Sequence, residues 1–113
     1  MTADNTGGAE TTRSLLLVDD DKVWLQRLAT AMSRRDFEVT TAASVEEAID
    51  QARKIAPDFA VVDLRLDDGS GLDVVTALRD VRPDGRIVML TGYGNIATAV
   101  AAVKLGAVDY LSK

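Results

Sequence analysis

Four short apolar runs in this chain lead to residues suited to phosphate or metal chemistry. Residues 15–18 stop at Asp19 and Asp20, 59–62 at Asp63, 87–90 at Thr91, and 107–111 lead to Lys113. If the runs are parallel strands, their ends lie along one edge of one sheet, where ligands of open α/β sheets bind. One pocket would then collect three carboxylates, a hydroxyl and an ammonium group.

Helical patterns separate these runs from Ser14 onward. Residues 22–35 repeat apolar side chains with a 3.6-residue period, and residues 44–47 form a capping box before a second helix that stops before Pro57. The composition of residues 67–71 is typical of a turn, with Ser70 as N-cap of a third helix.

The rest of the chain continues the alternation. Residues 37–41 predict a strand, and a fourth helix is expected between Asn95 and Gly106. The resulting βαβαβαβαβ order predicts an α/β fold, a parallel sheet with right-handed crossovers and helices on both faces.

Composition indicates one small domain and excludes several kinds of site. The chain has 113 residues, 47% of them hydrophobic, and a net charge of −5 without a basic run, so this segment is not expected to bind DNA or a membrane itself. Zero Cys and zero His leave only oxygen ligands for a metal. No apolar stretch is long enough to span a membrane, residues 1–13 read as a disordered leader, and a cytoplasmic location is expected.

Each of these residues also has a purely structural interpretation. Strand-end aspartates often cap helices, and Thr91 or Lys113 alone is more often structural than functional. Their joint placement at one sheet edge favours function. The large aromatic residues Trp24, Phe37 and Phe59 are predicted to lie in the core.

The motifs carry a specific resemblance. Residues 17–21, 62–64, 90–92 and 109–113 resemble the signature set of the response-regulator receiver domain of two-component signalling, and residues 91–100 resemble the RegA/PrrA/ActR group of redox-responsive global regulators. The resemblance covers residues 14–113. It implies a flavodoxin-like (CheY-like) doubly wound sheet of five parallel strands in the order 2-1-3-4-5.

The resemblance also implies a phosphorylation site. Asp63 would accept a phosphoryl group from a sensor histidine kinase, making the chain a phosphoacceptor signalling domain and not an enzyme with an external substrate. Asp20 and Asp63 would hold Mg²⁺ together with the Arg65 backbone carbonyl, and Asp19 would act mainly through a bound water. When no metal is bound, the clustered carboxylates should repel one another, and this repulsion is expected to raise the pKa values of some of them.

Further roles follow from the same resemblance. Thr91 and Lys113 would contact the phosphoryl oxygens. Thr91 and Tyr110 would form a conformational switch. DNA would be a partner only through an effector domain outside this sequence. Because the family's fifth helix is missing, we expect a bare apolar face on the fourth and fifth strands, and therefore a longer protein or self-association.

The same residues allow other interpretations. A haloacid-dehalogenase-type phosphatase needs a second Asp two residues after the first, and Arg65 occupies that position. The remaining alternative is a receiver-like protein-interaction module that works without phosphorylation. Uptake of a small phosphodonor would distinguish the two.

Overall fold

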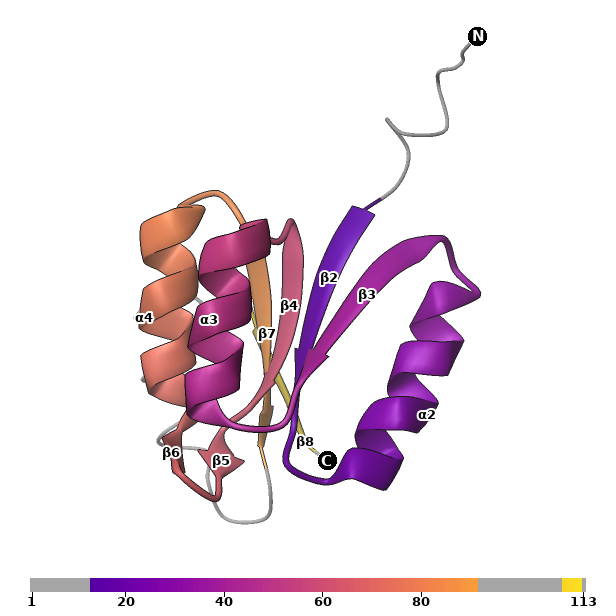
Figure 1. Ribbon diagram of the computed structural model, residues 1–113, viewed down its shortest axis with the longest axis horizontal. Helices are drawn as coiled ribbons and strands as arrows, with labels where there is room; N and C mark the ends of the chain where they lie inside the picture. Colours follow the sequence, from indigo (N-terminus) through magenta and orange to yellow (C-terminus); the bar gives the residue numbers. More distant parts are fainter. Residues whose placement is uncertain (1–12, 92–108, 113) are drawn as a thin grey trace, which may run out of the picture.

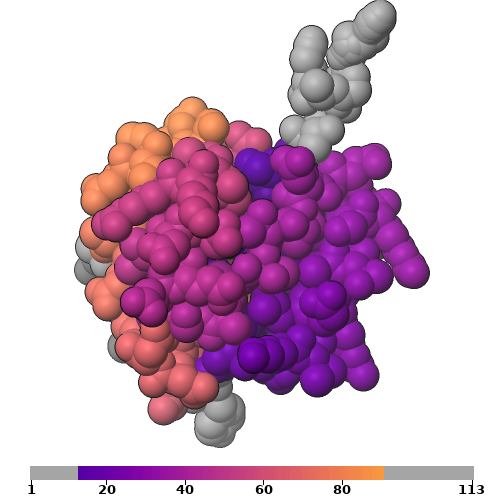
Figure 2. Space-filling model, viewed as in Figure 1, coloured from indigo at the N-terminus to yellow at the C-terminus, as the bar shows by residue number. Residues whose placement is uncertain are grey.

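A computed structural model of the protein describes residues 13–91 and 109–112, with side chains for residues 13–90. A central sheet lies between α2 on one side and α3 and α4 on the other (Figure 1). The side chains of α3 and α4 meet on the face shown in Figure 2. The elements are β2 (Arg13–Val18), α2 (Lys22–Ser33), β3 (Phe37–Ala42), α3 (Val45–Ile55), β4 (Phe59–Asp63), β5 (Arg65–Leu66), β6 (Gly69–Ser70), α4 (Gly71–Val81), β7 (Arg86–Thr91) and β8 (Asp109–Ser112).

The main sheet has five parallel strands in the order β3-β2-β4-β7-β8. This is the predicted 2-1-3-4-5 order. The register pairs Val18 with both Ala42 and Val62, and it pairs Asp63 with Leu90. The carboxyl ends of β2, β4 and β7 therefore meet at one edge, as the sequence predicts.

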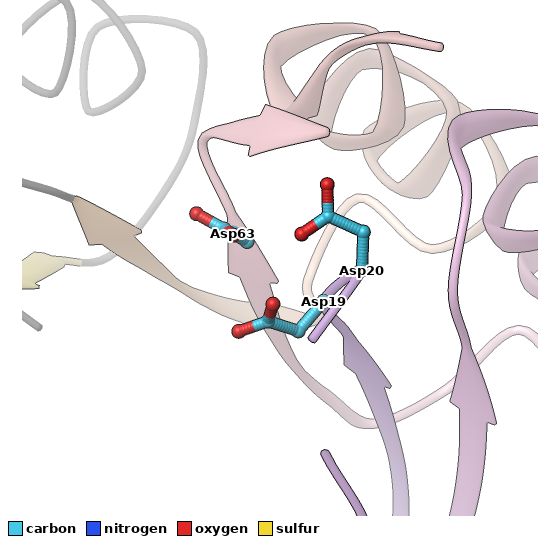
Figure 3. A group of neighbouring side chains, drawn as sticks. All are labelled: Asp19, Asp20 and Asp63. Carbon is cyan, nitrogen blue, oxygen red and sulfur yellow. The ribbon is translucent and has the colours of Figure 1, made fainter. Parts of the chain in front are cut away.

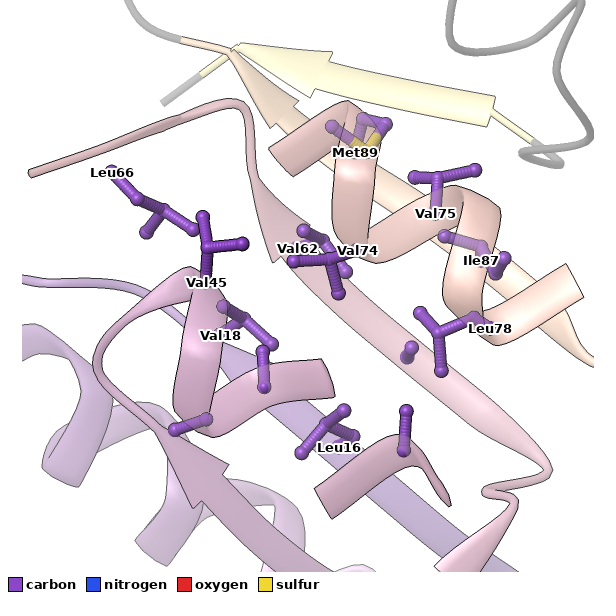
Figure 4. Packing of buried hydrophobic residues seen from close by; sticks show 14 of the residues in the cluster. Leu16, Val18, Val45, Val62, Leu66, Val74, Val75, Leu78, Ile87 and Met89 are labelled. Atoms are coloured by element: carbon purple, nitrogen blue, oxygen red, sulfur yellow. The ribbon is translucent and has the colours of Figure 1, made fainter. Parts of the chain in front are cut away.

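Side-chain alternation along β2 divides the core in two. Leu16 and Val18 face α3 and α4, whereas Leu15 and Leu17 face α2. Burial of each such side chain stabilises the fold by about 1.5–3 kcal/mol. The larger cluster (Figure 4) contains Leu16, Val18, Ala42, Val45, Ala48, Ala52, Ala60, Val62, Leu64, Leu66, Val74, Val75, Leu78, Ile87 and Met89.

The smaller cluster lies under α2. Its buried members are Leu15, Leu17 and Leu25, with Leu28, Ala29, Met32, Phe37, Val39, Phe59 and Val61 packed against them. The rings of Phe37 and Phe59 meet edge to face with centroids 5.7 Å apart. Both aromatic residues thus have the predicted core role, whereas Trp24 is half-buried and lies outside both clusters.

Local hydrogen bonds confirm two predicted helix starts. The Ser44 side chain accepts from the Glu47 N–H at 3.1 Å, as in the predicted capping box. The Glu47 carboxylate accepts from the Ala43 N–H at 2.8 Å, so its return bond reaches the residue before the cap and not Ser44 itself. Ser70 caps α4 by accepting from the Leu72 N–H at 3.1 Å.

Several boundaries differ from the sequence prediction. The first helix ends at Ser33 and not at residue 35, because the chain turns and Asp36 adopts a φ of 67°, which a right-handed helix cannot contain. β5, just before the predicted turn, and β6, within it, form a small antiparallel pair that the sequence did not indicate. β2 begins at Arg13, the last residue of the predicted leader.

Two further predictions concern the carboxyl-terminal part of the chain, from β7 onward. On β7, Val88 is half-buried and Leu90 is 6% exposed, so the expected bare face does not include Leu90. The side chains of β8, the other strand of that face, lie outside the described residues. The predicted fourth helix between Asn95 and Gly106 lies outside the described residues, as does Lys113.

Candidate functional site

Three carboxylates converge at the carboxyl edge of the sheet (Figure 3). Asp19 and Asp20 follow β2, and Asp63 is the last residue of the neighbouring strand β4. One oxygen from each carboxylate lies within 4.8 Å of the other two. Asp19 and Asp63 are buried, with exposures of 0% and 5%, and Asp20 is half-buried. The prediction that these three carboxylates lie close together is therefore confirmed.

Backbone groups orient two of the carboxylates. The Asp19 side chain accepts from the Asp21 N–H at 2.9 Å, and the Asp63 side chain accepts from the Arg65 N–H at 3.3 Å. Asp21 itself caps α2, because its carboxylate accepts from the Trp24 N–H at 3.1 Å. The acidic triplet is thus divided between a site (Asp19 and Asp20) and a helix cap (Asp21).

A fourth carboxylate, that of Asp67, lies beside Asp20. The pKa of Asp20 is raised first by burial, then by a side-chain hydrogen bond with Asp67 and by the negative charges of Asp67 and Asp19. The direction agrees with the rise in pKa expected of clustered carboxylates, and Asp67 is a larger cause of it than Asp19. Sequence reasoning assigned Asp67 only to a turn, since nothing in the linear pattern indicated that this turn folds back over the residues after β2.

The donor set of this site suits a hard divalent cation. It offers carboxylate oxygens from Asp19, Asp20 and Asp63, with neither imidazole nor thiolate, and such ligands favour Mg²⁺ or Ca²⁺ over softer metals. A cation would also offset the repulsion among these neighbouring negative charges. The residues present therefore fit the predicted metal.

The other predicted site residues are described only in part. Thr91 ends β7 directly after Leu90, the residue paired with Asp63, so its backbone lies at the same edge of the sheet. Tyr110 lies in β8 opposite Met89. The side chains of Thr91 and Tyr110, and the whole of Lys113, fall outside the described part of the structure. Their roles stay predictions.

One hollow on the described surface lies away from the clustered aspartates. An open hollow of about 620 Å³ lies over the outer face of α2, lined by Lys22, Val23, Gln26, Arg27 and Thr30. None of the clustered aspartates lines this hollow. The candidate site is therefore defined by the three carboxylates that lie close together, and not by the volume of a hollow. None of the helices in the described part has the length and apolarity needed to cross a membrane.

Comparison with known proteins agrees with the geometry. Residues 15–113 match the response regulator receiver domain family. The photosynthetic apparatus regulatory protein RegA of Cereibacter sphaeroides is 69% identical over 89% of this chain and 55% of its own length. The acid tolerance regulatory protein ActR of Rhizobium meliloti is 57% identical over 100% of this chain and 61% of its own length. The chain thus spans little more than half the length of these relatives.

Solved structures share the same fold. A response regulator protein from Burkholderia pseudomallei, described with a phosphorylated aspartic acid, a calcium ion and citrate, is 44% identical with a TM-score of 0.84 over 89% of this chain and 59% of that one. A CheY-like receiver domain protein from Methanospirillum hungatei is 26% identical with a TM-score of 0.85, covering 91% of this chain and 82% of that one. This chain belongs to the response regulator receiver domain family and is similar to the RegA and ActR regulators.

Proposed function

We propose that Asp63 accepts a phosphoryl group from a phosphohistidine of a sensor histidine kinase. A carboxylate oxygen of Asp63 forms the new O–P bond, the N–P bond breaks, and its electron pair returns to the imidazole nitrogen of the kinase. The observation that carries this proposal is the position of Asp63: a buried carboxylate at a strand end, within 4.8 Å of two other carboxylates that can hold a cation. The donor imidazole must come from another protein or from a region outside this sequence, because these 113 residues contain no His.

Asp19, Asp20, Asp63 and the Arg65 backbone carbonyl are the proposed protein ligands of Mg²⁺, with Asp19 acting mainly through water. Mg²⁺ would neutralise negative charge around the transferring group. Thr91 would donate its hydroxyl to one phosphoryl oxygen, and the Lys113 ammonium would neutralise another, which suits the dispersed charge of phosphoryl transfer. The Arg65 N–H already bonds to the Asp63 carboxylate and so helps to orient it.

Uptake of a small phosphodonor tests the proposal directly. In the full-length protein, phosphoramidate or acetyl phosphate with Mg²⁺ should add one phosphoryl group, seen by intact mass, and Asp63→Asn should abolish this addition. Asp50→Asn is the matched control, because Asp50 is exposed on α3 and the charge change is the same. Labelling that persists in Asp63→Asn would refute the assignment, and no labelling of the wild type would favour the phosphorylation-independent interaction module.

The proposed consequence is a change of surface, not a chemical product. Thr91 would move toward the phosphoryl group and Tyr110 would rotate, so that the region around β7 and β8 presents a different face to a partner. We propose that the longer protein, acting in the cytoplasm, controls transcription through an effector domain that binds DNA. The names of several relatives as regulatory proteins support this proposal.

Self-association belongs to the same proposal. Phosphorylation is expected to increase it, and sedimentation of the full-length protein with and without phosphodonor would measure the change. Asp63→Asn should show no response to the phosphodonor. A wild type that is fully phosphorylated and still monomeric would contradict this part.

A further inference from the structure

The short β5–β6 pair carries two acidic residues that contact different parts of the molecule. Leu66 pairs with Gly69, so Asp67 and Asp68 form the loop between the two strands. The Asp67 carboxylate lies beside that of Asp20, at the acidic cluster, and is one of the groups that raise the pKa of Asp20 after burial. The loop therefore lies between the candidate site and the start of α3.

Asp68 makes the contact on the other side. Its carboxylate accepts from the Val45 N–H at 2.8 Å and from the Glu46 N–H at 3.3 Å. These are the first two backbone N–H groups of α3, and no carbonyl within the helix can accept from them. The Ser44 side chain accepts only from the third, that of Glu47. A negative charge at a helix N-terminus is also electrostatically favourable. Asp68 thus binds a residue 23 positions earlier and completes the cap of α3.

Other contacts fix the two ends of the segment formed by β5, its loop and β6, residues 65–70. Leu66 is buried in the larger core cluster together with Val45, and the Gly71 N–H donates to the Leu64 carbonyl at 2.8 Å. Asp68 then fastens the loop itself to α3. With its ends and its loop held, the segment keeps Arg65 next to Asp63 and Asp67 next to Asp20.

We propose that Asp68 is a positioning residue for the phosphorylation site: by tying the β5–β6 loop to the N-terminus of α3, it holds the segment that carries the Arg65 carbonyl, one of the proposed Mg²⁺ ligands, beside Asp63. The inference rests on the proposed function, since it assigns a support to the same site. Asp68 itself contacts neither metal nor phosphoryl group. It acts through its neighbours in the loop.

The experiment compares Asp68→Ala, Asp68→Asn and Ser44→Ala in the full-length protein. Calorimetric titration with Mg²⁺ should show a dissociation constant about tenfold higher for Asp68→Ala, the lower end of the effect of removing an outer support of a metal site. Asp68→Asn should recover part of the affinity, because its amide oxygen still accepts from an N–H. Ser44→Ala weakens the same helix end without touching the loop, so its dissociation constant should stay close to that of the wild type.

Hydrogen exchange without metal gives an independent readout. Asp68→Ala should speed exchange of the Val45 and Glu46 amides, whereas Ser44→Ala should speed that of Glu47. Asp50→Asn, with the same loss of charge on the exposed side of α3, should change neither these amides nor the Mg²⁺ affinity. If Asp68→Ala does not fold, Asp68→Asn must bind Mg²⁺ more weakly than Asp50→Asn does for the proposal to stand.

The outcomes separate the two proposals. A wild type that binds Mg²⁺ and is phosphorylated, alongside an Asp68→Ala variant of equal affinity, would overturn the positioning role and leave the proposed function intact. An equal loss of affinity in Ser44→Ala would also overturn it, because general weakening of α3 would then explain the effect. A wild type that binds no Mg²⁺ would overturn both proposals.

Discussion

Gly71 approaches the backbone of Asp63 so closely that a Cβ atom on Gly71 would come within 2.2 Å of the Asp63 carbonyl oxygen. The same segment is held by the bond from the Gly71 N–H to the Leu64 carbonyl. No side chain fits between the first turn of α4 and the end of β4, so glycine is required by space at this position. The place of the proposed phosphoacceptor therefore depends on a residue eight positions later.

Gly71→Ala is expected to lower the free energy of unfolding by about 1–3 kcal/mol, because the new methyl group must displace the backbone at Asp63 or at α4. Urea unfolding measures the change. Thr76→Ala, at an exposed position on the same helix, should change the free energy of unfolding by less than about 0.5 kcal/mol. A Gly71→Ala protein as stable as the wild type would contradict the close approach.

Ala56→Gly should stabilise the protein by about 0.5–1 kcal/mol. Ala56 ends α3 in the left-handed conformation with φ 40° and ψ 66°, where the Cβ of an L-residue is unfavourable and glycine is not. The same substitution inside α2, Ala31→Gly, should destabilise by about 1 kcal/mol because helical backbone disfavours glycine. Opposite signs in thermal unfolding would confirm the prediction, and two losses of similar size would refute it.

Asp68 should make part of the stability depend on pH. Hydrogen bonds from the Val45 and Glu46 N–H groups lower the pKa of Asp68 below its ordinary value, with the Val45 bond the larger cause. Because the folded pKa is the lower one, the stabilisation is complete above the unfolded pKa of about 4 and is lost as the pH falls through the folded pKa. Wild type should exceed Asp68→Asn in stability at pH 7, and the gap should close in acid. A gap that does not change with pH would contradict this.

Asp20 should have the opposite dependence in metal-free protein. Burial, and then Asp67 and Asp19, raise its pKa, so its ionisation disfavours the folded state as the pH rises from about 4 through the folded pKa. With a chelator at pH 7, Asp20→Asn should raise the free energy of unfolding by roughly 0.5 kcal/mol. The value is small because water screens this half-exposed group. Added Mg²⁺ should stabilise the wild type more than the variant. Equal stabilisation by Mg²⁺ in both proteins would argue against a ligand role for Asp20.

The features that depend on neighbours along the chain could be predicted from the sequence. The alternation of strand and helix, the caps at Ser44 and Ser70 and the burial of β2 on both faces follow from periodicity and from side chains that bond within three residues. The meeting of Asp19, Asp20 and Asp63 was also predictable, since parallel strands carry their ends to a common edge.

The contacts of the β5–β6 loop could not be predicted in the same way. Asp67 and Asp68 are adjacent in a segment that has the composition of an ordinary turn, yet Asp67 lies beside Asp20, whereas Asp68 accepts from the N–H groups of Val45 and Glu46. Likewise, nothing local distinguishes Gly71 as a position where a Cβ would strike Asp63. The sequence by itself determined the order of the elements and the edge where the acidic residues gather, because periodicity and chain connectivity are local properties. Only the tertiary structure decided that Asp67 lies at the site and that Asp68 ties a loop to α3, because these roles depend on distances between segments that are far apart along the chain.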